Sequence, residues 1–181
     1  SAASDVYKRQ ESAPSQGLLL MRHPIDLSVY LVLDPDLCGG AQGMIETTRA
    51  AVQNGATCVQ LRAPHWKKRA LVECGRALKS VLADFNVPLI INDHADVCLA
   101  VGAEGLHVGQ DDLSPLDARA IIGNEKILGL SVSNTQELSA VDIRLVDHLG
   151  IGPIFSTSTK PDASAALGLN GFASLASRKP C

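Results

Sequence analysis

The sequence predicts an α/β fold of the TIM-type (β/α) barrel class. Short runs of β-type apolar residues alternate with helix-type segments six times along the chain, which is typical of a parallel sheet covered by helices. Hydrophobic residues make up 46% of the chain and aromatic residues only 3%, so the core has to be aliphatic, as in buried parallel strands. Polar residues follow the apolar runs and do not precede them, which places a polar rim at one end of the sheet.

The expected strands are six apolar runs, at residues 29–34, 57–62, 88–93, 105–110, 126–131 and 147–152. The clearest helix lies between the second and third runs. It is marked by apolar residues at spacings of three or four: Leu71, Cys74, Leu78, Leu82 and Phe85. Further helices are expected near residues 43–54, 94–101, 115–122, 134–142 and 170–177.

Helix ends are indicated by short motifs. "NGA" at 54–56 and "VGAEG" at 101–105 are typical helix stops, and "DLSP" at 112–115 and "SNTQE" at 133–137 are typical helix starts. The glycines of "DLCGGAQG", at 36–43, could form a phosphate-binding loop, but the P-loop lysine is missing there. We therefore expect a mobile loop after the first strand.

The chain divides into a leader and one domain. Residues 1–27 show no regular period and are interpreted as a disordered or non-native leader, whereas residues 28–181 form the barrel domain. A complete barrel has eight strand-helix units, and about six are recognisable. We therefore expect a C-terminally truncated barrel whose first and sixth strands have exposed edges, with low stability and little activity as an isolated chain.

Composition excludes several classes of partner. The net charge of −3 and the pI near 5.9 predict no basic surface for nucleic acid. No apolar run approaches the roughly 20 residues of a membrane span. Five cysteines without a C-x-x-C pair argue against a disulfide framework or a zinc site and are typical of buried thiols in the reducing cytoplasm. Small molecules are the expected partners, and an oligomer is compatible with the sequence.

Polar side chains at the strand ends favour a closed barrel over an open doubly wound sheet. They are Asp34, Gln60, Arg62, Asn92, Asp93, Gln110, Asp111, Asp112, Ser131 and residues 156–160. In a barrel these ends meet at one rim, where such folds place their sites, whereas in an open sheet they spread along an edge. No G-x-G-x-x-G follows the first strand, which weakens the open-sheet alternative further.

The residue types at this rim indicate a magnesium–diphosphate substrate. Asp93 and Asp112 offer the hard oxygen ligands that Mg²⁺ takes, with helix capping as the alternative role of both. Arg62 and Lys160 are cations suited to phosphate oxygens, and the hydroxyls of residues 157–159 are further donors. No Ser-His-Asp or Cys-His nucleophile set stands out, and His107 is interpreted as a core histidine.

Four segments together resemble the thiamine-phosphate synthase family, in order and at matching separations from about residue 29 to residue 179. They are "VQLR", "PLIINDHADVCLAVGAEGLHVGQDDL", "ILGLSV" and "LGIGPIFSTSTKPD". The resemblance implies a (β/α)₈ barrel and a transferase of thiamine biosynthesis. Such an enzyme couples 4-amino-5-hydroxymethyl-2-methylpyrimidine diphosphate to a thiazole phosphate, often carboxylated, and releases thiamine phosphate and pyrophosphate.

The resemblance also implies roles for residues. Asp93 and Asp112 would bind Mg²⁺, and Arg62, Ser131 and Lys160 would act in catalysis. Contacts with the pyrimidine diphosphate would come from Gln60, Arg62, Asn92, Ser131 and Lys160. Contacts with the thiazole phosphate would come from Thr157, Ser158 and Thr159.

One position departs from the family pattern. Pro64 stands where the family usually has a lysine, two residues after the arginine of its "QLR-x-K" motif, so a diphosphate contact is expected to be missing unless Lys67 or Lys68 replaces it. Two alternatives remain, a thiazole tautomerase-like isomerase on the same barrel and a non-catalytic phosphate-binding barrel. The paired carboxylates and the "TKPD" segment argue against the isomerase, whereas Pro64 and the missing strands motivate the non-catalytic barrel.

Overall fold

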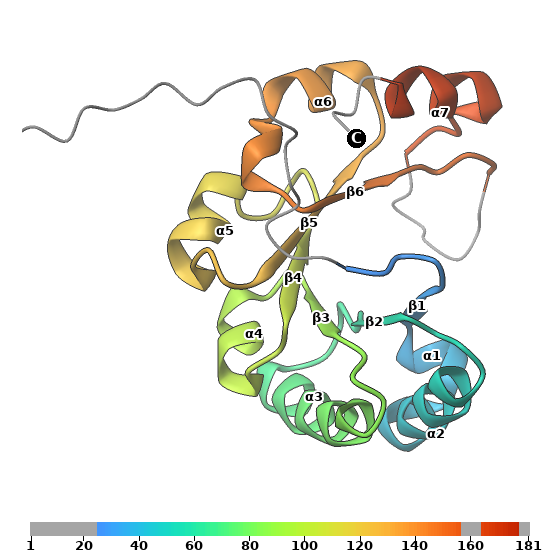
Figure 1. Cartoon of the computed structure of the whole chain (residues 1–181), viewed down its shortest axis with the longest axis vertical. Coiled ribbons are helices and arrows are strands. Elements are labelled where there is room, and N and C mark those ends of the chain that lie inside the picture. The colour runs from blue at the N-terminus through green and yellow to red at the C-terminus, as the bar shows by residue number, and fades with distance from the viewer. Residues whose placement is uncertain (1–24, 157–163, 178–181) are drawn as a thin grey trace, which may run out of the picture.

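Six parallel strands form one sheet in chain order. The computed structural model describes residues 25–156 and 164–177 (Figure 1). Within these ranges each strand pairs with its neighbours in the sequence. The strands are β1 (Tyr30–Leu33), β2 (Cys58–Leu61), β3 (Leu89–Asn92), β4 (Gly105–Val108), β5 (Ile127–Val132) and β6 (His148–Ile151). All six expected strands are confirmed, and their order is that of a (β/α) barrel.

Helices connect the strands. They are α1 (Pro35–Cys38), α2 (Gly40–Gln53), α3 (Lys68–Ala83), α4 (Ala95–Val101), α5 (Pro115–Ile122), α6 (Thr135–Ala140) and α7 (Gly168–Ala176), with a 3₁₀ turn at Ile143–Leu145 before β6. The expected starts are confirmed, because Ser114 and Asn134 occupy the N-cap positions of α5 and α6 and accept hydrogen bonds from backbone N–H groups there. Gly102, at φ 70°, ends α4 as expected.

The segment after β1 differs from the mobile loop that its glycines indicated. It forms the one-turn helix α1 and leads directly into α2. Asp34 accepts a hydrogen bond from the N–H of Asp36 at 2.9 Å, and Pro35 supplies a helical φ at the first position. Gly39 then ends the turn at φ 79°, a left-handed conformation that glycine adopts without strain. Capping chemistry overrides the glycine content here.

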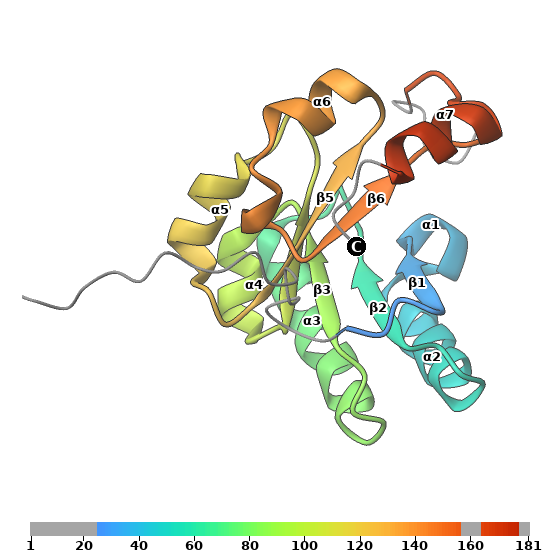
Figure 2. The same cartoon turned by 45° about the horizontal axis from the view of Figure 1, so that its top comes forward.

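The sheet is curved, and its helices cover the convex side (Figure 2). β1 and β6 are the edge strands among the described residues, yet they approach each other across the concave side. The rings of Tyr30 on β1 and His148 on β6 lie 5.8 Å apart, centroid to centroid. The six strands thus form a large part of a barrel wall around a common interior.

The two faces of each strand bury different groups. Alternate residues point outward and form the main core with the helices, among them Leu33, Leu61, Leu89, Ile91, Leu106, Leu128 and Leu130. Each such side chain contributes about 1.5–3 kcal/mol when fully buried. Inward, Cys58, Ile90 and Ile127 form a smaller cluster that Ile25 and Tyr30 cover. Packing therefore includes Ile25, three residues ahead of the expected domain start at residue 28.

Three of the cysteines, Cys58, Cys74 and Cys98, behave as the sequence predicted, whereas Cys38 is half-buried and Cys181 lies outside the described residues. Cys58, Cys74 and Cys98 are buried and reduced. Burial raises the pKa of the Cys58 thiol to about 12 and the pKa values of Cys74 and Cys98 to about 11. Such thiols are unreactive apolar side chains.

A buried ion pair, which the sequence did not reveal, connects α5 to the start of β6. Arg119 Nη2 lies 2.5 Å from Asp147 Oδ2, and both side chains are at most 5% exposed. Arg119 also donates to the carbonyl oxygens of Leu145 and Lys126, at 2.7 and 2.6 Å. Asp147 Oδ2 accepts from the N–H of Leu128 at 2.7 Å. The pair therefore links α5, the residues before β5, β5 itself and the residues before β6 at the N-terminal end of the sheet. Its charges are buried but well supplied with hydrogen-bond partners.

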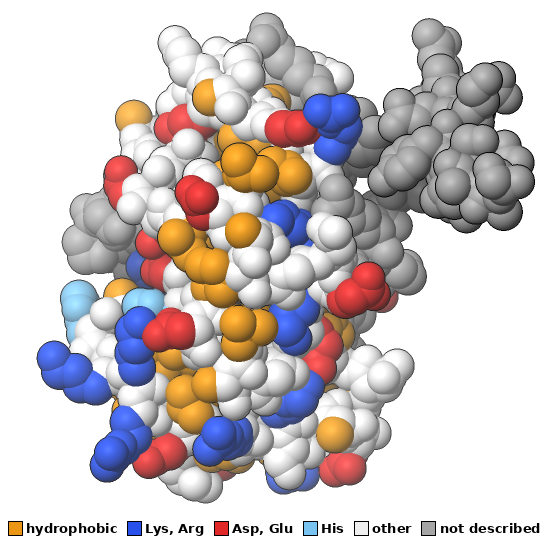
Figure 3. Space-filling model, turned by 90° about the vertical axis from the view of Figure 1, so that its left-hand side faces the viewer, with side chains coloured by type: hydrophobic (Ala, Val, Ile, Leu, Met, Phe, Trp, Pro, Cys, Tyr) orange, Lys and Arg blue, Asp and Glu red, His pale blue; other side chains and the backbone are white. Residues whose placement is uncertain are grey.

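The outer surface has mixed charge. On the side shown in Figure 3, small groups of hydrophobic side chains lie between basic and acidic side chains. In the groove between α3 and α4, Lys68 pairs with Asp96. No helix in the described ranges has the length and apolar character that a membrane crossing requires.

Candidate active site

A hollow of about 680 Å³ opens at the C-terminal ends of the strands. We call it the C-terminal hollow. Its described lining residues follow β2 through β6, and five of the residues expected to form a site are among them: Arg62, Asn92, Asp93, Asp112 and Ser131. The parallel register explains this convergence, because strand ends that are neighbours in the sheet deliver their next residues to one rim.

Asp93 leaves β3 in an unusual conformation. Its φ is 61°, a left-handed value that aspartate tolerates better than most residues and that often occurs at functional sites. Its N–H donates to the carbonyl oxygen of His107 at 2.8 Å, which attaches the turn to β4. The N-cap position of α4 belongs to His94.

Asp112 lies in the loop between β4 and α5. Its Oδ2 accepts the N–H of Gly109 at 2.8 Å, which closes the turn that carries the carboxylate to the hollow. The cap of α5 is Ser114, whose hydroxyl accepts the N–H of Asp117. The N-cap positions of both following helices are thus held by other residues than the two aspartates.

These two carboxylates fit one kind of metal better than others. Among the described residues, no group of three or more His, Cys, Asp or Glu side chains is placed to hold an ion. Zinc sites usually need three or four such ligands, whereas Mg²⁺ uses one or two carboxylates and completes its shell with water and phosphate oxygens. The donor set of Asp93 and Asp112 is therefore compatible with Mg²⁺ bound together with a phosphorylated ligand.

Arg62 is the only lysine or arginine among the described residues that line the hollow. Its side chain is 21% exposed, and its Nη1 lies 3.7 Å from Asp34 Oδ2. Asp34 also caps α1, so one carboxylate shapes the first loop and steadies the guanidinium. The sequence placed Asp34 at the rim without identifying this role. Pro64 lines the same hollow, as its position after Arg62 suggested.

Neither lysine proposed to replace the missing one lines this hollow. Lys68 is on the outer surface, paired with Asp96, and Lys67 is the exposed residue before α3. Lys160 and the hydroxyl residues Thr157, Ser158 and Thr159 lie outside the described residues. Ser164, the next described residue after that segment, does line the hollow.

Gln60 lies deeper than the other expected residues. It is only 5% exposed and is not among the residues that line the hollow. Its Nε2 donates to the hydroxyl of Tyr30 at 2.9 Å. Burial raises the pKa of the Tyr30 phenol. The phenol therefore stays protonated in this interior layer.

Two histidines in the barrel interior adjoin the site. His107, interpreted from the sequence as a core residue, is 9% exposed and lines the C-terminal hollow. Its Nε2 lies 2.9 Å from Ser131 Oγ, and its Nδ1 lies 3.4 Å from His148 Nε2. His148 was not singled out by the sequence. The only available signal was its place at the start of an apolar strand, where a histidine is unusual.

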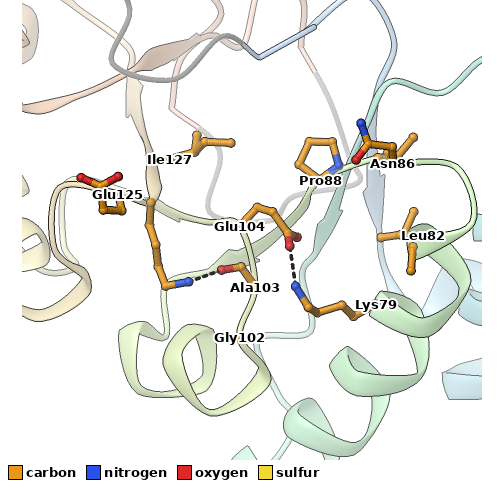
Figure 4. A pocket seen from close by; sticks show the side chains of 12 residues that line it. Lys79, Leu82, Asn86, Pro88, Gly102, Ala103, Glu104, Glu125 and Ile127 are labelled. Atoms are coloured by element: carbon orange, nitrogen blue, oxygen red, sulfur yellow. Dashed lines mark hydrogen bonds and ion pairs between the residues drawn. The ribbon is translucent and has the colours of Figure 1, made fainter.

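A second hollow, of about 520 Å³, lies at the N-terminal ends of β3, β4 and β5 (Figure 4). We call it the N-terminal hollow. Three of the four charged residues that line it contact each other or the backbone. Lys79 pairs with Glu104, whose Oε2 accepts the N–H of Leu89 at 2.9 Å, and Lys126 Nζ donates to the carbonyl oxygen of Ala103 at 2.5 Å. These contacts hold loops together.

Comparisons with known proteins agree with the geometry. Residues 29–181 match the model of the family described as thiamine monophosphate synthase. A thiamine-phosphate synthase from Xanthobacter autotrophicus is 54% identical over 148 residues, which cover 82% of this chain and 70% of that protein. One from Azorhizobium caulinodans is 54% identical over 87% of this chain and 74% of its own. The solved thiamine phosphate pyrophosphorylase from Pyrococcus furiosus superposes with a TM-score of 0.72, at 27% identity, over 83% of this chain and 70% of its own.

Proposed function

The chain belongs to the thiamine-phosphate synthase family, and from this premise we propose that it joins an aminopyrimidine methyl diphosphate to a thiazole phosphate. The products are thiamine phosphate and pyrophosphate, so the reaction is an alkyl transfer with a diphosphate leaving group. The observation that carries the proposal is the C-terminal hollow, which gathers Arg62, Asn92, Asp93, Asp112 and Ser131 from four successive strand ends.

The reaction suits a site without a protein nucleophile. The C–O bond to the diphosphate breaks first, and the electrons leave with the diphosphate. The resulting pyrimidine-methyl cation is delocalised into the electron-rich aminopyrimidine ring. The thiazole nitrogen then forms the new C–N bond with its lone pair. The protein has to stabilise the departing negative charge and to hold the two rings in line.

Arg62 and the aspartates serve the diphosphate in this proposal. Arg62, steadied by Asp34, presents N–H donors to phosphate oxygens, and Asn92 adds a neutral donor beside it. Asp93 and Asp112 would hold Mg²⁺ against the same oxygens. When bound, this ion would neutralise charge that develops on the leaving group. Pro64 offers no cation, so Arg62 and, by resemblance, Lys160 carry more of this task.

The remaining assignments rest on the family pattern together with placement. Ser131 lies on the wall of the hollow, where it can orient the pyrimidine, and its carbonyl oxygen accepts from Gln110 Nε2 at 2.7 Å. Gln60 would act from beneath, through the interior layer. Thr157, Ser158 and Thr159 would bind the thiazole phosphate.

The direct test is product formation by the 181-residue chain. Incubation with both substrates and Mg²⁺, followed by separation and fluorescent detection of oxidised thiamine phosphate, should show turnover, at the low level expected of this chain in isolation, that chelation with EDTA abolishes. An Arg62→Ala variant should lose most of it. Binding of the pyrimidine diphosphate without any turnover would instead support the non-catalytic barrel and refute the proposed activity.

A further inference from the structure

We propose that His107 and His148 form a positioning device for the Ser131 hydroxyl on the wall of the C-terminal hollow. The inference rests on the proposed function, because it assigns Ser131 to the pyrimidine diphosphate. It adds two residues from the barrel interior that act through Ser131. Neither histidine is asked to exchange protons with the substrate.

The contacts form a continuous path. Ser131 Oγ lies 2.9 Å from His107 Nε2, and the opposite ring nitrogen, Nδ1, lies 3.4 Å from His148 Nε2. The two imidazole centroids are 5.4 Å apart. Both histidines are at most 9% exposed. The path therefore leads from the hollow into the interior through groups that water reaches poorly.

Glycines on the neighbouring strands make room for this pair. Gly129 on β5 stands in register with His107 on one side and His148 on the other. A Cβ at position 129 would lie under 3.0 Å from a ring nitrogen of each histidine. At Gly150 a Cβ would lie 3.3 Å from His107 Cε1. Both glycines thus stand at inward-facing positions where a larger residue would place its side chain in the interior. The two imidazoles occupy that space instead.

The path gives Ser131 a defined hydrogen-bonding state. A hydrogen bond between two imidazole nitrogens requires a proton on one and none on the other. In a neutral His107 this contact therefore couples the position of the ring proton, on Nδ1 or on Nε2, to the tautomer of His148. His107 Nε2 then either donates to the serine hydroxyl or accepts from it. An aminopyrimidine ring offers both donors and acceptors, so a hydroxyl with one fixed direction holds it in one orientation.

A role in core packing alone makes a different prediction, which a double-mutant cycle separates. If His107 acts through Ser131, His107→Ala should lower kcat/KM about 10- to 100-fold in the wild-type background. In the Ser131→Ala background the same change should have an effect within about twofold. The loss should fall on kcat, with the KM for the thiazole phosphate unchanged. His65→Ala, at an exposed position, is the matched control.

An equal loss in both backgrounds would overturn the proposal. His107→Gln, which can place an amide nitrogen near Ser131, should recover part of the activity, and no recovery would also count against it. If His107→Ala fails to unfold cooperatively on heating, the cycle is run with His107→Phe, which fills the space but has no ring nitrogen. Should the wild-type chain make no thiamine phosphate, the proposed function fails, and the cycle is measured on calorimetric binding of the pyrimidine diphosphate.

Nuclear magnetic resonance tests the path without any turnover. In ¹⁵N-labelled protein, Ser131→Ala should change the chemical shift of His107 Nε2, and His148→Phe should change that of His107 Nδ1. The signals of His65 should stay in place in both variants. Unchanged His107 signals in both variants would refute the path even if the enzyme were active.

Discussion

The two ends of the same six strands carry polar residues that serve different purposes. At the N-terminal ends, charged side chains bind each other and the backbone, as Lys79 does with Glu104 and Arg119 with Asp147. At the C-terminal ends, Arg62, Asp93 and Asp112 line an open hollow. The comparison teaches that a polar strand end has to be judged by its partners. A residue whose partners are protein groups stabilises the fold, whereas a residue that faces a hollow is available to a ligand.

The largest effect is expected when the buried ion pair at the N-terminal ends of the strands is removed. Arg119→Ala leaves Asp147 as an uncompensated buried charge, which typically costs about 3–5 kcal/mol of unfolding free energy. Urea denaturation followed by circular dichroism should show the loss, while kcat per folded molecule stays close to wild type. Arg144→Ala, which removes an exposed pair with Asp142, is the control and should change the midpoint little. Equal effects of the two variants would contradict the assignment of Arg119.

The next largest effect concerns the C-terminal ends of the strands and should appear in enzymatic activity. Asp93→Asn removes one charge but keeps a residue that tolerates the left-handed backbone at this position. We expect kcat/KM to fall about 10²–10³-fold, as for other losses of transition-state charge stabilisation, with little change in the urea midpoint. Asp96→Asn, three residues later on the outer surface, should retain activity. A variant that loses stability and activity in parallel would instead indicate a structural role.

A smaller effect is expected at the N-terminal hollow. Lys79 and Glu104 are more than one third exposed, so solvent screens their pair and its contribution to stability should be at most about 1 kcal/mol. Lys79→Ala should therefore shift the urea midpoint slightly and leave kcat/KM unchanged. A clear loss of substrate binding in this variant would show that the N-terminal hollow also takes a ligand.

The smallest effect is a pH dependence at the outer surface. A hydrogen bond from Lys68 holds the carboxyl pKa of Asp96 below its ordinary value of 3.8. Its contribution is fully present above the unfolded-state pKa, near pH 4, and is lost as the pH falls through the lowered folded-state pKa. Urea midpoints measured between pH 2 and 5 should therefore decline slightly less for Asp96→Asn than for wild type. Identical pH profiles would show that this contact contributes nothing.

The regular elements were predictable because each one has a local signature. Six apolar runs gave the strands, and periodic apolar residues or caps such as Asn134 gave the helices. The turn α1 was missed because four residues show no period, and its formation depends on the Asp34 side chain. The position of β1 and β6 across a common interior, marked by Tyr30 and His148, depends on curvature that no local pattern encodes.

The site was only partly predictable for the same reason. Rim residues such as Asp93 and Asp112 were found because they directly follow strands. The pairs Arg119–Asp147 and His107–His148 join residues 28 and 41 positions apart, and each member alone resembles an ordinary residue of an apolar segment. The depth of Gln60 was equally hidden, because strand alternation gives a face but not a layer.

The most direct test of the comparison is calorimetric titration of the pyrimidine diphosphate into three proteins, with and without Mg²⁺. The proteins are the wild-type chain, Asp93→Asn and Lys79→Ala. Binding to the wild type and to Lys79→Ala should depend on Mg²⁺ equally, whereas Asp93→Asn should bind weakly and lose most of the metal dependence. Full Mg²⁺-dependent binding by Asp93→Asn, or its loss in Lys79→Ala, would contradict the assignment of the C-terminal hollow as the diphosphate site.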